Sequence, residues 1–290
     1  MLVIGEKING TRKLVNKAVL TRDVEHIRKL ALSQVEAGAD VLDINAGTSP
    51  EREPEDIIWL VNVVQEITDK QLCLDSPNPE ALLAGLGATK QPPIINSISC
   101  EEHRLSGVLP IVAKFGCPVL ALALDGGTIQ TTCEGRMAIV RRLFEETRKA
   151  GVADDMVYVD PLVMSVATDT KACLITLETM RSILREYPTA HLTGGLSNVS
   201  FGLPARTLLN RAFLTLAIEA GLDSAIVDPT DRGLMETLYA TNAVLGRDRH
   251  CAQYNRAFRA GKIGPKLEDR KVDEKKPVAV AAAAAPFPVK

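Results

Sequence analysis

The stretch VLALALD, residues 119–125, consists of six apolar side chains followed by one carboxylate. Short apolar runs that end in an acidic or amide side chain occur eight times along the 290-residue chain. The polar residues that end these runs are Glu6, Asp43 with Asn45, Asp75, Asn96, Asp125, Asp160, Asn198 and Asp228. Strands that are buried on both faces, as parallel strands are beneath covering helices, have continuous apolar runs of this kind. We therefore expect the polar ends to emerge together at one rim of a parallel sheet.

Amphipathic stretches with helical spacing lie between these runs. They cover residues 22–37, 54–67, 78–87, 101–115, 134–150, 170–186, 205–220 and 231–245. Asp23 is a suitable N-cap for the first helix, and Gly38 and Gly116 follow helix ends, where a left-handed residue is needed. Strand and helix alternating eight times predict a (β/α)8 TIM barrel, an α/β architecture that commonly needs about 250 residues in a single domain.

A doubly wound open sheet is the alternative α/β architecture. Such a sheet usually has a GxGxxG turn after its first strand, and residues 5–10, GEKING, do not match that pattern. We therefore assign residues 1–262 to one barrel. Residues 263–290 are charged and then rich in alanine and proline, a composition typical of a flexible, disordered tail.

Charge and composition exclude several classes of partner. The formal net charge of −2 gives no basis for binding nucleic acid or an anionic membrane, because phosphate binding needs a basic surface. No segment has the ~18 consecutive apolar residues of a membrane span, and the first residues lead into a strand without a secretion signal. The six cysteines contain no CxxC pair, which is typical of reduced thiols. We expect a cytoplasmic protein.

Three strand ends predict a binding pocket. Asp75, Asn96 and Asp160 end different strands and have apolar neighbours. Taken one at a time, each is explained as well or better by helix capping. In a barrel, however, they converge on one pocket that has carboxylates and an amide but no cluster of cations. Carboxylates accept hydrogen bonds from N–H groups and Asn both donates and accepts, so the pocket favours a neutral heterocycle over a phosphorylated ligand.

The most distinctive local feature is GGLSNVSFG, residues 194–202. Its glycines allow close backbone approach, and Asn198 follows them at the predicted rim. Arg206 and Arg211 lie in the next helix, where an anionic ligand tail or a surface ion pair accounts for each of them. The chain has no HxH or HExxH motif and no GxSxG motif, and Ser197 has no evident histidine base. We expect neither a metal site nor a nucleophilic serine.

Seven segments resemble, in order, the blocks of the pterin-binding methyltransferases, which move a methyl group between methyltetrahydrofolate and a corrinoid protein. They are residues 1–10 (MLVIGEKING), 42–45 (LDIN), 73–76 (CLDS), 95–97 (INS), 158–162 (YVDPL), 195–200 (GLSNVS) and 209–214 (LNRAFL). The resemblance covers the whole predicted barrel. Each block alone is weakly specific, but their order and their places at strand ends make the set specific.

The resemblance implies a homodimeric enzyme in which Asp75, Asn96 and Asp160 hold the pterin ring. It also implies that Asn198 is the catalytic residue, hydrogen-bonded near N5 of the pterin. We expect the pocket to extend to the remaining rim residues and their neighbours, namely Glu6, Asp43, Asn45, Ser197, Arg206 and Asp228. The corrinoid (cobalamin) should arrive on a partner protein, because the DxHxxG motif of corrinoid-binding domains is absent and residues 101–106, EEHRLS, do not match it.

Two alternative functions and the direction of transfer remain open. Dihydropteroate synthase shares the barrel and the pterin pocket, but its phosphate-handling loops have cations where this chain has NAGTSP (residues 45–50) and SNVS (residues 197–200). A noncatalytic folate-binding protein would keep the pterin pocket without reactive geometry at N5. The methyl group could move to a corrinoid iron–sulfur protein in acetyl-CoA synthesis, or to tetrahydrofolate during demethylation of methoxylated or methylated amine substrates.

Overall fold

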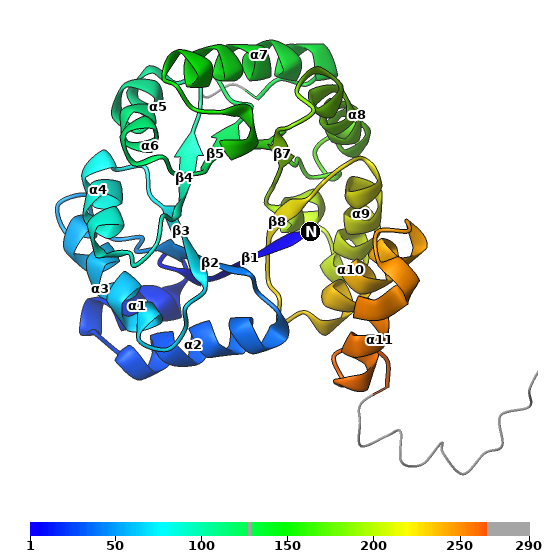
Figure 1. Ribbon diagram of the computed structural model, residues 1–290, viewed down its shortest axis with the longest axis horizontal. Helices are drawn as coiled ribbons and strands as arrows, with labels where there is room; N and C mark the ends of the chain where they lie inside the picture. Colours follow the sequence, from blue (N-terminus) through cyan, green and yellow to red (C-terminus); the bar gives the residue numbers. More distant parts are fainter. Residues whose placement is uncertain (127–128, 266–290) are drawn as a thin grey trace, which may run out of the picture.

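Eight parallel strands form a barrel in the computed structural model, which describes residues 1–126 and 129–265 (Figure 1). The strands are β1 (Leu2–Asn9), β2 (Val41–Asn45), β3 (Gln71–Asp75), β4 (Ile94–Ile98), β5 (Val119–Leu122), β6 (Val157–Asp160), β7 (His191–Leu192) and β8 (Ser224–Val227). β1 pairs with β2 and β8, and pairing continues in sequence order from β2 to β7. The predicted (β/α)8 barrel is confirmed.

The barrel closes between β7 and β8 mainly through side chains. β7 has only two residues, and the backbone contact across this seam is an isolated parallel bridge between Gly195 and Ile226. Below that bridge, the backbone N–H of Leu192 donates to Asp223 Oδ1 at 2.9 Å, and Ser224 Oγ donates to Leu192 O at 3.0 Å. We call this stretch the β7–β8 seam. At this seam, hydrogen bonds that involve side chains join the two strands, whereas backbone hydrogen bonds join the other pairs of strands.

Helices surround the strands on all sides (Figure 1). They are α1 (Lys13–Thr21), α2 (Val24–Ala37), α3 (Glu53–Gln65), α4 (Pro79–Ala88), α5 (Glu102–Gly107), α6 (Leu109–Phe115), α7 (Cys133–Lys149), α8 (Ala172–Glu186), α9 (Arg206–Glu219), α10 (Arg232–Val244) and α11 (Ala252–Arg259). The predicted caps hold: Asp23 accepts from the N–H of His26 at 3.1 Å, and Gly38 and Gly116 are left-handed at φ 113° and 62°.

The helices differ from the prediction in three places. α1 and α11 were not predicted; neither begins with a side-chain cap that a sequence pattern would reveal. The stretch 101–115, predicted as one helix, is two helices, α5 and α6, which meet at Val108. Pro110 explains the break, because it lacks an N–H and its ring clashes with the preceding turn.

The barrel interior changes from apolar to polar along the strands. Near its amino-terminal end it is filled by a cluster that includes Ile4, Val41, Cys73, Ile94 and Leu120, with Tyr158 and Ile226 packed against it. Because side chains alternate between the two faces of a strand, the residue two positions later faces the interior again. On six strands that residue is polar: Glu6, Asp43, Asp75, Asn96, Asp160 and Asp228. The predicted polar rim is therefore the upper layer of the barrel interior.

The C-terminal region packs outside the ring of helices, where α11 lies next to α10 (Figure 1). Ile263, the first residue of the predicted tail, is buried. Residues 266–290 of that tail lie outside the described residues. In the two described ranges, no helix combines the length and the apolar character needed to cross a membrane.

Candidate functional site

Four side chains from β2, β3 and β4 form a hydrogen-bonded group at the barrel mouth. Asn45 Nδ2 donates to Asp75 Oδ2 at 3.0 Å and to the Asp75 carbonyl at 3.2 Å. Asn96 Nδ2 donates to Asp43 Oδ1 at 3.3 Å. These strands are neighbours in the sheet, and their register sets Asp75 opposite Asn96. The structure thus brings together Asp75 and Asn96, two members of the predicted pterin site, with Asp43 and Asn45 from the wider set.

The two carboxyl groups of this cluster both have raised pKa values. Asp43 is 3% exposed, and burial, followed by the charge of Asp75, raises its pKa to about 8. Burial also raises the pKa of Asp75, against the hydrogen bond from Asn45 and the positive charge of Arg104. Neither carboxyl makes an ion pair within the described part of the chain. Asp43 therefore favours its protonated form near neutral pH, and Asp75 is a half-buried acceptor that makes no ion pair.

Asp160 reaches the same interior from β6, on the other side of the barrel. Its Oδ1 accepts from the N–H of Leu162 at 2.8 Å, and the N–H of Gly195 also donates to the carboxylate. Burial raises its pKa to about 6, and these backbone hydrogen bonds limit the rise. Gly194 packs against the carboxylate, since a Cβ at that position would lie 3.3 Å from Asp160 Oδ1. The glycine leaves room for the carboxylate to face the barrel mouth.

Asn198 lies close to Asp160 across the two glycines. It belongs to the 3-10 segment η2 (Leu196–Ser200), which follows β7 directly. Its Nδ2 sits 3.0 Å from where a Cβ of Gly195 would be, and the same glycine donates its N–H to Asp160. Asn198 is exposed, and its side-chain amide makes no hydrogen bond within the described residues. The GG pair thus places a free amide beside a buried carboxylate.

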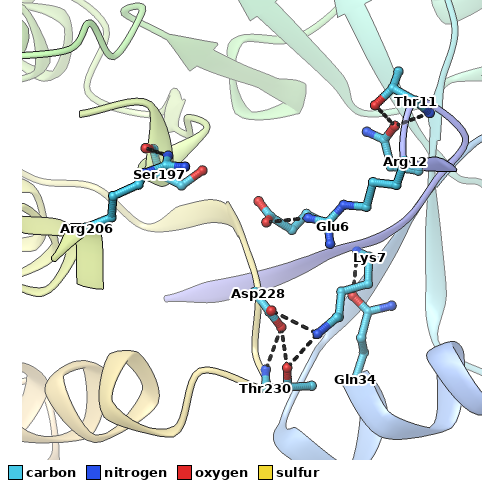
Figure 2. Close-up of polar contacts among 10 residues, drawn as sticks. Glu6, Lys7, Thr11, Arg12, Gln34, Ser197, Arg206, Asp228 and Thr230 are labelled. Atoms are coloured by element: carbon cyan, nitrogen blue, oxygen red, sulfur yellow. Dashed lines mark hydrogen bonds and ion pairs between the residues drawn. The ribbon is translucent and has the colours of Figure 1, made fainter. Parts of the chain in front are cut away.

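Arg206 holds the η2 segment in place. Its Nε donates to Ser200 Oγ at 3.0 Å, and its Nη2 donates to the Ser197 carbonyl at 2.6 Å. Figure 2 shows the guanidinium beside Ser197, on the opposite side of the view from Arg12. The other candidate, Arg211, forms an ion pair with Asp231 at 3.3 Å. Of the two arginines considered from the sequence, only Arg206 keeps its charge free of a carboxylate among the described residues.

A cleft of about 280 Å³ opens between η2 and the ends of β1 and β8. It is lined by Glu6, Arg12, Leu196, Ser197, Arg206, Asn210, Val227, Asp228, Asp231 and Leu234. Arg12 Nη2 pairs with Glu6 Oε1 at 3.0 Å, and Lys7 Nζ pairs with Asp228 Oδ2 at 3.0 Å (Figure 2). Although burial acts to raise it, hydrogen bonds from Thr230 and Lys7 lower the pKa of Asp228. On this side of the barrel mouth, Glu6 and Asp228 are therefore already paired with cations.

The predicted residues therefore form two groups. One group contains two hydrogen-bonded pairs on neighbouring strands, Asn45 with Asp75 and Asn96 with Asp43, together with Asp160 and Asn198 across the barrel. Glu6, Ser197, Arg206 and Asp228 line the cleft. Asp125, the fifth of the eight predicted strand ends, belongs to neither group, because β5 stops at Leu122 and the carboxylate turns outward to Arg142 at 2.8 Å.

Sequence reasoning missed three residues of the site: Lys7, Arg12 and Cys73. The Cys73 thiol hydrogen-bonds to Asp43, and this contact follows from the strand register that sets the two residues opposite each other. Lys7 contacts Asp228 because β1, the first strand of the sequence, pairs with β8, the last. In the described ranges, no group of three or more His, Cys, Asp or Glu side chains is arranged to hold a metal ion.

Comparisons with known proteins agree with this geometry. A model of the pterin-binding enzyme family matches residues 5–228. The chain is 41% identical over 267 residues to the methylcorrinoid:tetrahydrofolate methyltransferase of Eubacterium limosum, which covers 91% of this chain and 98% of that protein. It is 32% identical over 240 residues to methionine synthase of Mycobacterium tuberculosis, a match that covers 78% of this chain but only 20% of that protein.

Solved structures of the same architecture include a dihydropteroate synthase. The enzyme from Xanthomonas albilineans, in complex with 7,8-dihydropteroate, superposes with a TM-score of 0.65. The superposition covers 84% of this chain and 92% of that one, at 21% sequence identity. At this level of identity the likeness establishes a common fold.

Proposed function

Because the chain belongs to the family of pterin-binding enzymes, and resembles a methylcorrinoid:tetrahydrofolate methyltransferase along almost its whole length, we propose that it is a methyltransferase. It moves a methyl group between N5 of methyltetrahydrofolate and the cobalt of a corrinoid that a partner protein carries. The observation that supports this most is the polar upper layer of the barrel interior, where Asp75 and Asp160 make no ion pair among the described residues and the free amide of Asn198 lies beside Asp160.

The pterin ring binds among Asp75, Asn96 and Asp160. A pterin presents amino and ring N–H donors together with ring acceptors along its edge. The two carboxylates accept from the donors, and the Asn96 amide matches either kind of group. Asp75 already accepts from Asn45, and Asp160 from the backbone of Leu162 and Gly195; a carboxylate has room for further donors, so the ligand adds its hydrogen bonds to these. The neutral ring then satisfies buried acceptors that are otherwise costly.

Asn198 acts at N5. A tertiary amine is a poor leaving group, so the C–N bond breaks only as N5 gains positive charge, by protonation or by a strong hydrogen bond. The amide of Asn198 lies within reach of the Asp160 end of the pocket, and it is free to reorient as charge develops. An interaction that strengthens on the way to the transition state increases the rate rather than the affinity. The methyl group passes directly to the acceptor without a covalent intermediate on the protein.

The corrinoid belongs to the partner. It supplies a cobalt nucleophile that accepts the methyl group, or the methyl group itself when transfer runs toward tetrahydrofolate. This chain contributes the folate site and the open mouth over which the partner binds. By analogy with the family, we propose that the enzyme is a cytoplasmic homodimer, and that demethylation of methoxylated or methylated amine substrates is one setting in which transfer runs toward tetrahydrofolate.

The cleft between η2 and β8 accepts the aminobenzoyl-glutamate tail of the folate. The tail leaves the pterin next to N5, and the residues that flank Asn198 on its N-terminal side, Leu196 and Ser197, line the cleft. Leu196, Val227 and Leu234 offer apolar contact for the aryl ring. Arg206, whose charge meets no carboxylate among the described residues, is available to the glutamate carboxylates.

A decisive experiment mixes the protein with methyltetrahydrofolate and free Co(I) cobalamin and follows the corrin absorption spectrum. We expect the cobalamin to become methylated at a rate proportional to enzyme concentration. Binding of methyltetrahydrofolate with no methyl transfer, in either direction and with a panel of corrinoid proteins present, would instead identify a noncatalytic folate-binding protein. Condensation of a pterin pyrophosphate with 4-aminobenzoate would identify a dihydropteroate synthase.

A further inference from the structure

Asp43 has no part in the proposed reaction, yet it is the most deeply buried carboxyl of the site. Its strand register sets it opposite Cys73, one inward-facing position closer to the apolar interior than Asp75. At 3% exposure it is covered by its neighbours, so a ligand at the barrel mouth does not reach it. Any effect of Asp43 on the ligand must therefore pass through a neighbouring side chain.

That neighbour is Asn96. Its Nδ2 donates to Asp43 Oδ1 at 3.3 Å and also hydrogen-bonds to the Cys73 sulfur, which itself contacts Asp43. A carboxamide has a donor end and an acceptor end on opposite sides of one carbon atom. With the nitrogen bonded to Asp43 and Cys73, the side-chain oxygen is the end of the amide that has no hydrogen bond among the described residues.

We propose that Asp43 is a positioning residue that fixes the Asn96 amide, so that Asn96 presents its oxygen to the N–H groups of the pterin. This inference rests on the proposed function. Without a carbonyl oxygen at position 43, the Asn96 amide can rotate and present its NH2 group to the ligand. An N–H donor facing an N–H donor loses a hydrogen bond and leaves both groups unsatisfied.

The protonation state of Asp43 supports this role. Burial and the nearby Asp75 keep it protonated, with a pKa of about 8, and Cys73 and Glu6 are the other titratable groups that face it. A protonated carboxyl still offers its carbonyl oxygen to Asn96, and it adds no second negative charge beside Asp75. The feature that Asn96 needs is thus a carbonyl oxygen, which a carboxamide also supplies.

Two substitutions separate positioning from a need for the carboxyl itself. We expect Asp43→Asn to bind methyltetrahydrofolate within about threefold of the unmodified protein, because its carboxamide oxygen replaces the carbonyl of the acid. We expect Asp43→Ala to weaken binding by roughly tenfold, the size of one lost hydrogen bond in a buried site. The dissociation constants are measured by titration calorimetry, and circular dichroism confirms that both variants are folded.

A double-mutant cycle then tests whether the effect passes through Asn96. Asn96→Ala and Asp43→Ala should not be additive, and the double variant should bind no more weakly than Asn96→Ala alone. The matched control combines Asp43→Ala with Asp160→Ala. Asp160 lies on β6, four strands away from β2 around the barrel, so those two losses should multiply.

Two results would overturn the inference. One is an Asp43→Asn variant that is folded but binds as weakly as Asp43→Ala; the other is full additivity between positions 43 and 96. Failure of the proposed function gives a different result, since the unmodified protein would then not bind methyltetrahydrofolate or would not transfer its methyl group. If Asp43→Ala does not fold, Asp43→Leu, which fills a similar volume without a carbonyl oxygen, takes its place in both the binding comparison and the cycle with Asn96→Ala.

Discussion

Asp75 and Asp228 occupy equivalent positions in the barrel but have different partners. Each follows an inward-facing apolar residue by two positions, at the carboxyl end of its strand. Asp75 is held by the amide of Asn45 and its pKa is raised, mainly by burial. Asp228 is held by Lys7 and Thr230, which lower its pKa despite burial. A carboxylate that is already ion-paired is committed to that contact, whereas one without an ion pair remains available to a ligand.

The largest effect on methyl transfer is expected for Asn198, because it is the residue proposed to act at N5 in the transition state. We expect Asn198→Ala to lower the rate of methyl transfer by about 10²–10³-fold, the range observed when one transition-state hydrogen bond is removed. The dissociation constant of methyltetrahydrofolate should change by less than about threefold, because the interaction strengthens only as N5 gains charge. Single-turnover kinetics and calorimetry measure the two quantities separately. Equal losses in rate and affinity would contradict the role at N5.

The comparison between Asp75 and Asp228 can be tested with a matched pair. Asp75→Asn should weaken binding of methyltetrahydrofolate by about 10- to 100-fold, because it removes a charged acceptor. Asp228→Asn should leave pterin affinity nearly unchanged, since that carboxylate already pairs with Lys7. Titration of both variants with a tail-less 5-methyl-tetrahydropterin removes any contribution from the cleft. Comparable losses of affinity in the two variants would show that the ion pair with Lys7 does not make Asp228 less available to the ligand than Asp75.

The pH dependence of binding should follow Asp160. Its pKa of about 6 means that the free protein protonates this carboxyl as pH falls through that value. The protonated form accepts N–H donors poorly, so affinity should be constant well above pH 6 and fall by up to about tenfold per unit below it. Calorimetry between pH 5 and 7, below the pKa of about 8 of Asp43, should give a clearly flatter profile for Asp160→Asn. Asp228, with its lowered pKa, should not contribute in this range.

The smallest effect is expected in the cleft. Arg206→Met should weaken methyltetrahydrofolate by about three- to tenfold and leave a tail-less 5-methyl-tetrahydropterin unaffected, because only the glutamate carboxylates meet the guanidinium. Loss of affinity for both ligands would mean that Arg206 acts only by holding Ser197 and Ser200. Arg211→Met is the control, since that arginine pairs with Asp231.

The polar layer could be predicted from sequence because it depends on a local pattern. An apolar run followed by a carboxylate or amide marks the end of a buried parallel strand, and parallel strands place those ends on one side. Asp125 shows the limit of that pattern. Its run is the longest of the eight, yet β5 ends at Leu122 and the chain turns, so the carboxylate meets Arg142 instead of the barrel interior.

Contacts between distant strands could not be predicted in the same way. The bond between Asn96 and Asp43 joins residues 53 positions apart, and that between Lys7 and Asp228 joins residues 221 positions apart. Such pairs depend on register and closure, which a single strand does not encode. The protonation of Asp43 follows from the same three-dimensional neighbours, because burial and Asp75 both act on it through space.

The β7–β8 seam gives the barrel wall an uneven stiffness. Ladders of backbone hydrogen bonds connect β1 through β6, with irregularities between β1 and β2 and between β4 and β5, and the residues proposed to bind the pterin lie on β3, β4 and β6 of this arc. Asn198 instead continues from the two-residue β7, where side chains and one bridge join the wall. Local opening should be easiest there, and backbone amides at the seam should exchange with solvent before those of β2 to β4. Asn198, whose amide we propose to reorient as N5 gains charge, therefore follows the part of the wall that opens most easily. The residues proposed to bind the pterin ring lie on strands that are paired more extensively.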